Sequence, residues 1–382
     1  MKATLFILGL SLLLVGIAPA DSLNVRFVGS CDTRGSAYDV AVRDSYAYVA
    51  AAAYGLRVVS IADPANPVEV GSCNTPGTAY GVAVNGDHAC VAAASAGLRI
   101  ISIVDPAHPT EVGYYDSLGS AMDVTMSVSY AYVAYDLYGL RVISIPGGVE
   151  TGCNDSLGEV RGVAVSGSYA CVANGDSGLR VISASSLVEV GHCETPGEAE
   201  GVAVSGTYAY VADGAGGLRV ISDSNPAQPF EVGYWVAPAY VYGVVVSGTN
   251  AFVAGGAAGL RVVSVSNPAL PGEVGYYDTT GIAHGVAVDG DYVYVAGGSA
   301  GLQIFQFFAT GVAESLKPQA PSRKPEPTVL SGASGVKRLA ASDVYDATGR
   351  RVVNPRSGIH FLRDAGRGAG GVVRTCKVVV QK

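Results

Sequence analysis

Positive charge is scarce in this sequence. Its 382 residues include 24 Lys and Arg against 32 Asp and Glu, which gives a formal net charge of −8 at pH 7. Proteins that bind nucleic acid or an anionic membrane surface through electrostatics present clusters of Lys and Arg. The sequence therefore argues against both kinds of partner, and we expect no nucleic-acid ligand.

Motifs that identify a metal centre or an active site are also missing. The sequence has no Cys-x-x-Cys, no His-x-x-x-His and no Asp-x-Asp-x-Asp-Gly calcium loop, and its Gly-rich runs lack the Lys of a phosphate-binding loop. We therefore expect no metal and no cofactor, and we do not expect an enzyme.

Long apolar runs are absent except at the start of the chain. Lys2 precedes an apolar run from Leu5 to Ile17, and Ala18-Pro19-Ala20 supplies small residues before a cleavage point. The run is short for a bilayer span of about 20 residues. We expect a cleaved signal peptide over residues 1–20, with an uncleaved anchor as the alternative, and no transmembrane segment in the mature chain.

Glycine, in contrast, is abundant, and it marks an internal repeat. The segment Gly-Leu-Arg, with Gly-Leu-Gln in the last copy, begins at Gly55, Gly97, Gly139, Gly178, Gly217, Gly259 and Gly301. The copies are 42, 42, 39, 39, 42 and 42 residues apart. A period of about 40 residues built from short strands is typical of a β-propeller.

One repeat contains the signals of four strands. In the second copy, residues 81–84 and 88–92 are apolar runs joined by the two-residue turn Asn85-Gly86, and residues 98–104 form a third run. Two prolines then interrupt the pattern before a fourth run at residues 110–113. The sequence predicts an all-β, seven-bladed propeller over residues 21–310.

The two ends of the array predict how the ring closes. The seventh copy ends after residues 302–307 without a fourth strand, whereas residues 25–29 precede the first copy and match the fourth strand of the others. We expect this N-terminal strand to complete blade seven, because closure of this kind leaves no unpaired edge.

Six copies carry Arg in the third strand and Glu in the fourth, which predicts structural ion pairs. The seventh copy has Gln303 at the Arg position and, with the closing strand in place, Phe27 at the Glu position. The predicted pairs are Arg57 with Glu69, Arg99 with Glu111, Arg141 with Glu150, Arg180 with Glu189, Arg219 with Glu231, and Arg261 with Glu273.

The cysteines follow the repeat as well. Cys90 and Cys171 occupy positions where other copies have Tyr or Phe, and Cys31, Cys73 and Cys193 occupy positions where others have Tyr or Trp. We expect them to fill the core as small hydrophobic residues. Disulfides are permitted in an exported protein but their pairing is not predictable; Cys171 and Cys193 share one repeat.

The repeat resembles the LVIVD repeat family. The resemblance rests on Gly-Val-Ala-Val, Tyr-Ala-Tyr-Val-Ala, Gly-Leu-Arg-Val-Ile-Ser-Ile and Asp-Pro-Ala-x-Pro-x-Glu-Val-Gly, as in residues 81–113 with local variants, and it covers about residues 23–308. It implies a β-propeller on secreted or surface-bound bacterial proteins and brings no catalytic residues.

The C-terminal part has a different composition. Residues 311–335 contain four prolines among Ser, Lys and Gly and predict an extended linker. Residues 336–382 contain Tyr-Asp-x-x-Gly-Arg, Gly-x-x-Phe and a basic end after a valine strand, and they resemble the C-terminal sorting domain of type IX secretion substrates. That resemblance implies the type IX machinery as a partner and secretion, or display on the outer surface of a Gram-negative-type cell; a degenerate copy or a plain adhesion-type β-domain is the alternative.

One position varies where the scaffold repeats. Immediately before the Gly-Val or Asp-Val that opens each inner strand stand Tyr38, Tyr80, Met122, Arg161, Glu200, Tyr242 and His284. In a propeller these residues lie on one face, near the mouth of the central channel. They are our candidate ligand-binding residues, and the alternative is that they only plug the channel, with Arg161 and Glu200 paired.

We therefore expect a secreted or cell-surface, non-enzymatic propeller that binds a protein or glycan through its channel face. The alternatives are a secreted hydrolase or lyase at the channel mouth, with Glu200, His284 and Arg161 as participants, and a purely structural surface component.

Overall fold

The computed structural model describes residues 22–116, 119–308, 344–345, 359–363 and 375–379. The chain divides into two units, residues Met1–Ala313 and Glu314–Lys382. The predicted signal peptide at residues 1–20 and the predicted linker at residues 311–335 lie outside the described residues.

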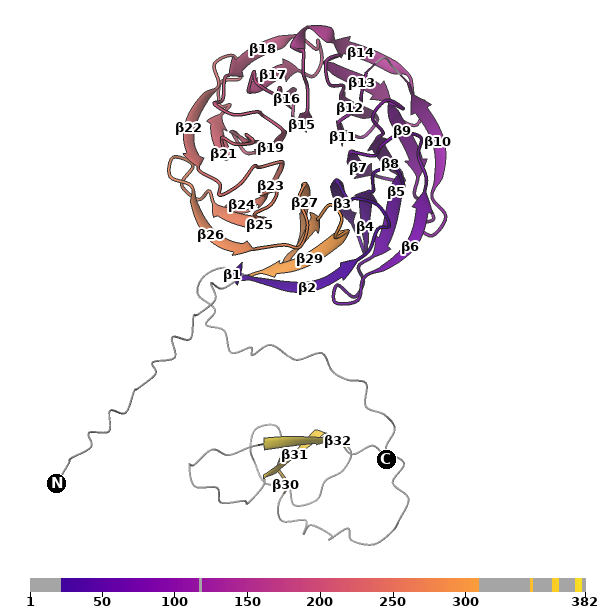
Figure 1. Ribbon diagram of the computed structural model, residues 1–382, viewed down its shortest axis with the longest axis vertical. Helices are drawn as coiled ribbons and strands as arrows, with labels where there is room; N and C mark the ends of the chain where they lie inside the picture. The colour runs from indigo at the N-terminus through magenta and orange to yellow at the C-terminus, as the bar shows by residue number, and fades with distance from the viewer. Residues whose placement is uncertain (1–21, 117–118, 309–343, 346–358, 364–374, 380–382) are drawn as a thin grey trace, which may run out of the picture. The chain divides into compact units, whose positions relative to one another are not determined.

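The first unit is a ring of seven antiparallel sheets around a central axis (Figure 1). The inner strands are β3 (Asp39–Arg43), β7 (Gly81–Asn85), β11 (Asp123–Met126), β15 (Gly162–Ser166), β19 (Gly201–Ser205), β23 (Gly243–Ser247) and β27 (Gly285–Asp289). The second strands are β4 (Tyr46–Ala50), β8 (His88–Ala92), β12 (Tyr130–Ala134), β16 (Tyr169–Ala173), β20 (Tyr208–Ala212), β24 (Asn250–Ala254) and β28 (Tyr292–Ala296).

The outer half of each blade consists of a third and a fourth strand. The third strands are β5 (Leu56–Ser60), β9 (Leu98–Ser102), β13 (Leu140–Ser144), β17 (Leu179–Ser183), β21 (Leu218–Ser222), β25 (Leu260–Ser264) and β29 (Leu302–Phe307). The fourth strands are β6 (Val68–Cys73), β10 (Thr110–Tyr115), β14 (Glu150–Asn154), β18 (Glu189–Cys193), β22 (Phe230–Trp235), β26 (Gly272–Tyr277) and β2 (Val25–Cys31). The only helix among the described residues is the 3-10 turn η1 (Asp155–Leu157).

Strand β2 is the fourth strand of blade seven, although it comes from the other end of the chain. It pairs antiparallel with β29, with Phe27 opposite Phe305 and Ser30 opposite Gln303. The pairing register shifts between Phe27 and Gly29, and the other six fourth strands have the same shift after their own Glu. The short strand β1 (Ser22–Leu23) adds to the neighbouring blade by pairing with β26.

Turn chemistry and burial explain why these residues form blades. Gly86 between β7 and β8 has a φ of 56°, which the two-residue hairpin turn needs and which glycine adopts without strain. Second and third strands are almost wholly apolar because neighbouring blades cover both of their faces. Each core cluster is shared by two blades, and the cluster of Val40, Ala47, Tyr294 and Ile304 joins blades one and seven.

Glycine in the fourth strand lets the blades approach closely at the outer rim. A Cβ built on Gly71 would overlap the carbonyl oxygen of Pro106, and one built on Gly29 would overlap that of Pro64. In each case the overlapping carbonyl belongs to the proline turn of the next blade. The glycine of the Glu-Val-Gly segment in one blade therefore packs against the proline turn of the next blade.

The second unit contains one described sheet of three antiparallel strands. Its order is β30 (Val344–Tyr345), β31 (Ile359–Arg363) and β32 (Thr375–Val379). All three strands lie within residues 336–382. No helix in the described part of the chain is long and apolar enough to cross a membrane.

Candidate functional site

The seven variable residues are fixed in place by contacts between neighbouring blades. The residue before each of them forms a β-bridge to the loop that joins the second and third strands of the previous blade, as in Ala52 with Ala79 and Gly298 with Ala37. The variable residue itself donates its backbone N–H to its own second strand, as Tyr80 does to Ala92 at 2.8 Å. The side chain is therefore free to vary while its backbone is held.

All seven predicted residues line one cavity. Its volume is ≈ 360 Å³, and its walls include Tyr38, Tyr80, Met122, Arg161, Glu200, Tyr242 and His284. The inner-strand positions that follow them complete the lining, among them the carboxyl groups of Asp39 and Asp123. The cavity thus has contributions from every blade of the ring.

Aromatic rings form a continuous arc along one side of this cavity. The ring of Tyr38 lies 5.1 Å from that of Tyr80 and 4.9 Å from that of His284, measured between centroids. His284 in turn lies 4.9 Å from Tyr242, which lies 4.9 Å from Tyr240. Burial lowers the pKa of His284, which favours its neutral form. Four adjacent blades therefore present ring faces and edges to the mouth.

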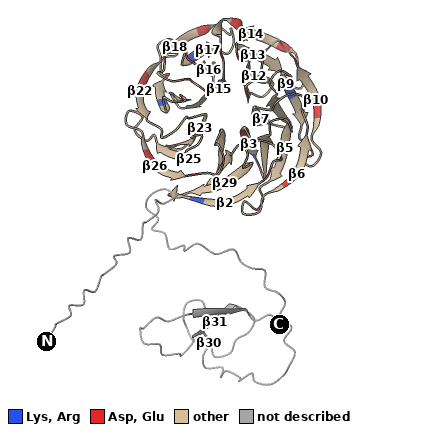
Figure 2. Ribbon diagram, in the orientation of Figure 1, with Lys and Arg blue, Asp and Glu red and all other residues tan. Residues whose placement is uncertain are grey.

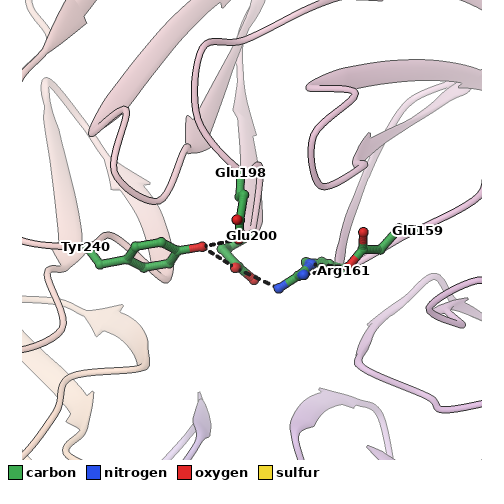
Figure 3. A network of polar contacts seen from close by, with 5 residues as sticks. All are labelled: Glu159, Arg161, Glu198, Glu200 and Tyr240. Atoms are coloured by element: carbon green, nitrogen blue, oxygen red, sulfur yellow. Dashed lines mark hydrogen bonds and ion pairs between the residues drawn. The ribbon is translucent and has the colours of Figure 1, made fainter.

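The opposite side of the cavity is charged and internally paired (Figure 3). Arg161 donates through Nη1 to Oε1 of Glu200 at 2.8 Å and through Nε to Oε1 of Glu159 at 3.0 Å. The hydroxyl of Tyr240 donates to Glu200 at 2.6 Å and lies 2.8 Å from Glu198. Arg161 and Glu200 therefore pair, as the alternative from the sequence anticipated, within a network that also contains Glu159, Glu198 and Tyr240.

Two half-buried aspartates at the inner end of this cavity did not appear among the predicted site residues. Asp39 and Asp123 stand where the other five inner strands begin with glycine. The N–H of Val82 donates to Oδ2 of Asp39 at 2.9 Å, and the N–H of Val163 donates to Oδ2 of Asp123 at 2.9 Å. Each carboxyl group thus accepts a hydrogen bond from the inner strand of the next blade.

Burial and mutual repulsion change the ionisation of this pair. Desolvation by burial, followed by the charge of Asp123, raises the pKa of Asp39 to about 7 against the opposing hydrogen bonds from Val82 and Val40. Burial likewise raises the pKa of Asp123. Two carboxylates that share a desolvated site disfavour double ionisation. Below the pair, the bore of the ring is lined by valine, alanine, Thr125 and Met126 from the inner strands.

The six Arg and Glu pairs lie away from the mouth, between third and fourth strands. The nitrogen-to-oxygen distances are 3.5 Å for Arg57 and Glu69, 3.7 Å for Arg99 and Glu111, 3.7 Å for Arg141 and Glu150, 3.4 Å for Arg180 and Glu189, 3.6 Å for Arg219 and Glu231, and 3.7 Å for Arg261 and Glu273. The arginines are more deeply buried than their partners. Figure 2 shows the acidic segments recurring along the outer strands.

Most of these arginines have further partners that the sequence pattern did not predict. Arg99 also contacts Asp116 at 2.7 Å and lies 5.0 Å from the ring centroid of Tyr114. Arg261 repeats this arrangement with Asp278 at 2.6 Å and Tyr276 at 4.7 Å. A guanidinium group that is planar and delocalised suits this combination of carboxylate pairing and ring stacking.

The cysteine prediction needs a correction for part of the set. Cys90 and Cys171 are buried as expected, but Cys31, Cys73 and Cys193 are only half-buried, because the fourth strand is the outer edge of its blade. Cys153 is exposed. All six cysteines of the described ring are free thiols, including Cys171 and Cys193.

The described residues contain no group of three or more His, Cys, Asp or Glu side chains that could hold a metal ion.

Comparison with solved structures gives the class of the fold, which is that of a β-propeller. The WD40 repeats of RRP9 match with a TM-score of 0.64 at 10% identity, over 74% of this chain and 97% of that one. A chain of the mitotic checkpoint complex matches with a TM-score of 0.64 at 13% identity, over 80% and 100%. BamB from Moraxella catarrhalis matches with a TM-score of 0.52 at 11% identity, over 72% and 84%.

The repeats also match a sequence family. The chain belongs to the LVIVD repeat family, whose repeat matches seven segments: residues 34–75, 76–117, 118–145, 157–195, 196–235, 238–279 and 280–305. No curated protein matches the chain.

Proposed function

We propose that this protein is a secreted or cell-surface propeller that binds a protein or glycan ligand at the channel mouth without transforming it. The observation that carries the proposal is the gathering of the seven variable residues around one cavity. A scaffold that repeats in seven copies while one side chain per copy differs, and whose differing side chains converge, has the organisation of a binding site.

The contacts at the mouth favour binding over catalysis. Arg161 and Tyr240 both donate to Oε1 of Glu200, so this oxygen is already hydrogen-bonded. Among the described residues, no carboxylate lies within hydrogen-bonding distance of the His284 ring, whose neighbours are the rings of Tyr38 and Tyr242. His284 therefore lacks the carboxylate partner that orients the base in a Ser-His-Asp type of hydrolase.

The proposed location rests on the two ends of the sequence. The apolar run at residues 5–17 has the composition of a signal peptide. The C-terminal pattern that resembles a type IX sorting domain supports export through that machinery and release from, or display on, a Gram-negative-type cell surface. If the sorting interpretation is right, mass spectrometry of the secreted protein will find the C-terminal residues removed; their recovery intact would contradict it.

The binding proposal is tested with the purified chain from residue 21 on glycan and peptide arrays. The aromatic arc is removed one ring at a time with Tyr38→Ala, Tyr80→Ala and Tyr242→Ala. Tyr130→Ala serves as the control, because Tyr130 is an exposed tyrosine at the start of a second strand, at the opposite end of its blade.

We expect at least one array ligand whose binding falls about tenfold or more in the arc variants and is unchanged in Tyr130→Ala. Two results would contradict the proposal: no ligand at all, or ligands whose binding depends on none of the three arc tyrosines. Release of a modified ligand during the assay would favour the enzymatic alternative.

A further inference from the structure

The floor of the mouth combines features that select a particular kind of ligand group. Asp39 and Asp123 belong to blades one and three, and Gly81 of blade two lies between them. A Cβ built on Gly81 would lie 3.1 Å from Oδ1 of Asp123, and one built on Gly285 would lie 2.6 Å from Oδ1 of Asp39. The carboxyl groups therefore occupy space that the neighbouring inner strands leave open by beginning with glycine.

Rings of the aromatic arc line the same cavity as the two aspartates. Tyr38 immediately precedes Asp39, and Tyr80 immediately precedes the glycine between the two carboxyl groups. The two tyrosine rings lie 5.1 Å apart. Carboxylates stabilise an ammonium group, and so does the face, but not the edge, of a tyrosine ring.

The charged side chains around the mouth also favour a cationic ligand group. Arg161 is the single cationic side chain among the cavity residues, and it is already bonded to Glu159 and Glu200. The carboxyl groups of the mouth and its network outnumber it; they are those of Asp39, Asp123, Glu159, Glu198 and Glu200. An anionic ligand group would be repelled, whereas a cationic one would be attracted.

We propose that the channel mouth binds a primary alkylammonium group, the side chain of a lysine in a partner protein, with its nitrogen at the carboxyl groups of Asp39 and Asp123. This inference rests on the binding function proposed above and names the group that the site selects. An ammonium group has three donors and a compact shape, so it can be shared between two carboxylates. Its four-carbon stem suits a passage lined by tyrosine rings and Met122.

The ionisation of Asp39 makes the proposed binding depend on pH. Because the pKa of Asp39 is about 7, this carboxyl is partly protonated at neutral pH and becomes a better ammonium acceptor as pH rises. A lysine ammonium, with a pKa of about 10.4, keeps its proton over this range. The other titratable groups that line the cavity are Tyr38, Tyr80, Asp123, Arg161, Glu200, Tyr242 and His284.

The probe for the test is Nα-acetyl-lysine methylamide, titrated into the purified chain from residue 21 and followed by ligand-observed NMR. Nα,Nε-diacetyl-lysine methylamide is the neutral counterpart, and glucosamine with N-acetylglucosamine tests whether an amino sugar is the source of the ammonium group. Asp39→Asn and Asp123→Asn remove charge but keep an oxygen acceptor for Val82 and Val163. Asp289→Asn is the matched control, since Asp289 is an exposed residue at the far end of an inner strand.

We expect the lysine probe to bind and its diacetyl counterpart not to bind. Each floor variant should weaken binding at least about fivefold, the double variant should abolish it, and Asp289→Asn should leave it unchanged. Binding should strengthen between pH 6 and pH 8. Circular dichroism and thermal melting of each variant establish that the ring is folded.

Three results would overturn the inference: equal binding of the acetylated probe, full binding by the folded double variant, or binding of glucosamine without binding of the lysine probe. If array ligands that depend on Tyr38 and Tyr80 carry no ammonium group, the inference fails while the proposed binding function stands. If no ligand depends on those tyrosines, the binding function itself fails.

Discussion

Six blades of the ring are made from continuous sequence, whereas blade seven joins strands from residues 25–31 and 285–307. Each of the six pairs an Arg with a partly exposed Glu, and four of these arginines are buried. Blade seven has Gln303 instead, and Gln303 donates to Thr280 at 2.9 Å. The same backbone pairing and the same register shift are present in both kinds of blade. The ion pair is therefore not required for the geometry of a blade.

Aromatic packing replaces the ion pair at the seam, which is the joint in blade seven between β2 and β29. The ring of Phe27 lies 5.8 Å from that of Phe305 and 6.3 Å from that of Tyr277, and Phe307 lies 5.7 Å from Phe252. Apolar contacts add stability in proportion to the surface they bury and need no matched partner charge. The comparison teaches that the joint between the chain ends is held by packing, and the internal blades by packing plus charge.

The largest effect should come from the seam core. Phe305 is fully buried, so Phe305→Ala should lower the free energy of unfolding by about 3–5 kcal/mol. Val59 occupies the same register position in blade one, and Val59→Ala removes fewer atoms and should cost less. Urea unfolding of both variants measures the difference. Equal losses would contradict a special role for aromatic packing at the seam.

Removal of an arginine from an internal blade should come next. Arg99→Met leaves Glu111 and Asp116 without their partner, and we expect a loss of about 2–3 kcal/mol, below the 3–5 kcal/mol of a fully buried pair because both carboxylates are partly exposed. The matched change at the seam, Gln303→Met, should cost less than about 1.5 kcal/mol. Urea unfolding at low and high salt checks both values. If Gln303→Met costs as much as Arg99→Met, the distinction between the two kinds of blade is wrong.

The contact between the fourth-strand glycine and the proline turn of the next blade should be equally important at the seam and in the internal blades. Gly29→Ala at the seam and Gly71→Ala in blade one both place a methyl group against a proline-turn carbonyl, so each should destabilise by about 1–3 kcal/mol. Gly272→Ala is the control, because no atom lies within 4 Å of its built Cβ. Thermal melting compares the three. A neutral Gly29→Ala would show that the seam is packed more loosely than the other joints.

A further comparison concerns the two inner strands that begin with Asp, where the other five begin with Gly. The pKa of Asp39 is raised by burial to about 7, so between about pH 4 and pH 7 the folded chain retains a proton that the unfolded chain has lost. This contribution to stability falls as pH rises through that window and is constant above it. Asp39→Asn should therefore gain stability relative to the parent chain as pH rises from 4 to 7. Urea midpoints at several pH values test this, and a difference that does not change with pH would contradict it.

Much of the ring could be predicted from the sequence because each blade repeats the same local signals. The seven-copy period, the hairpin turns such as Asn85-Gly86 and the alternation of apolar runs all depend on short-range chemistry. The position of the variable residues was also predictable, since a repeated backbone places Tyr38 and His284 at equivalent points in different blades.

Most of the side-chain contacts within the site could not be predicted, because the repeat pattern does not specify them. Asp39 and Asp123 were visible as departures from glycine, but their hydrogen bonds to Val82 and Val163 depend on the neighbouring inner strands. The bonds of Arg161 to Glu159 and of Tyr240 to Glu200 depend on side-chain rotamers, and the half-exposure of Cys73 depends on its place at the outer edge of a blade. Sequence reasoning identifies which positions face the mouth, and the structure shows which groups meet there.

The pairing of β2 with β29 has a consequence for how the ring is attached to whatever flanks it. The N–H of Phe308 donates to the carbonyl oxygen of Asn24 at 2.9 Å, so the polypeptide enters and leaves the disc at a single point on its circumference. A segment joined to either end of the ring would therefore be attached at this one position on its outer edge.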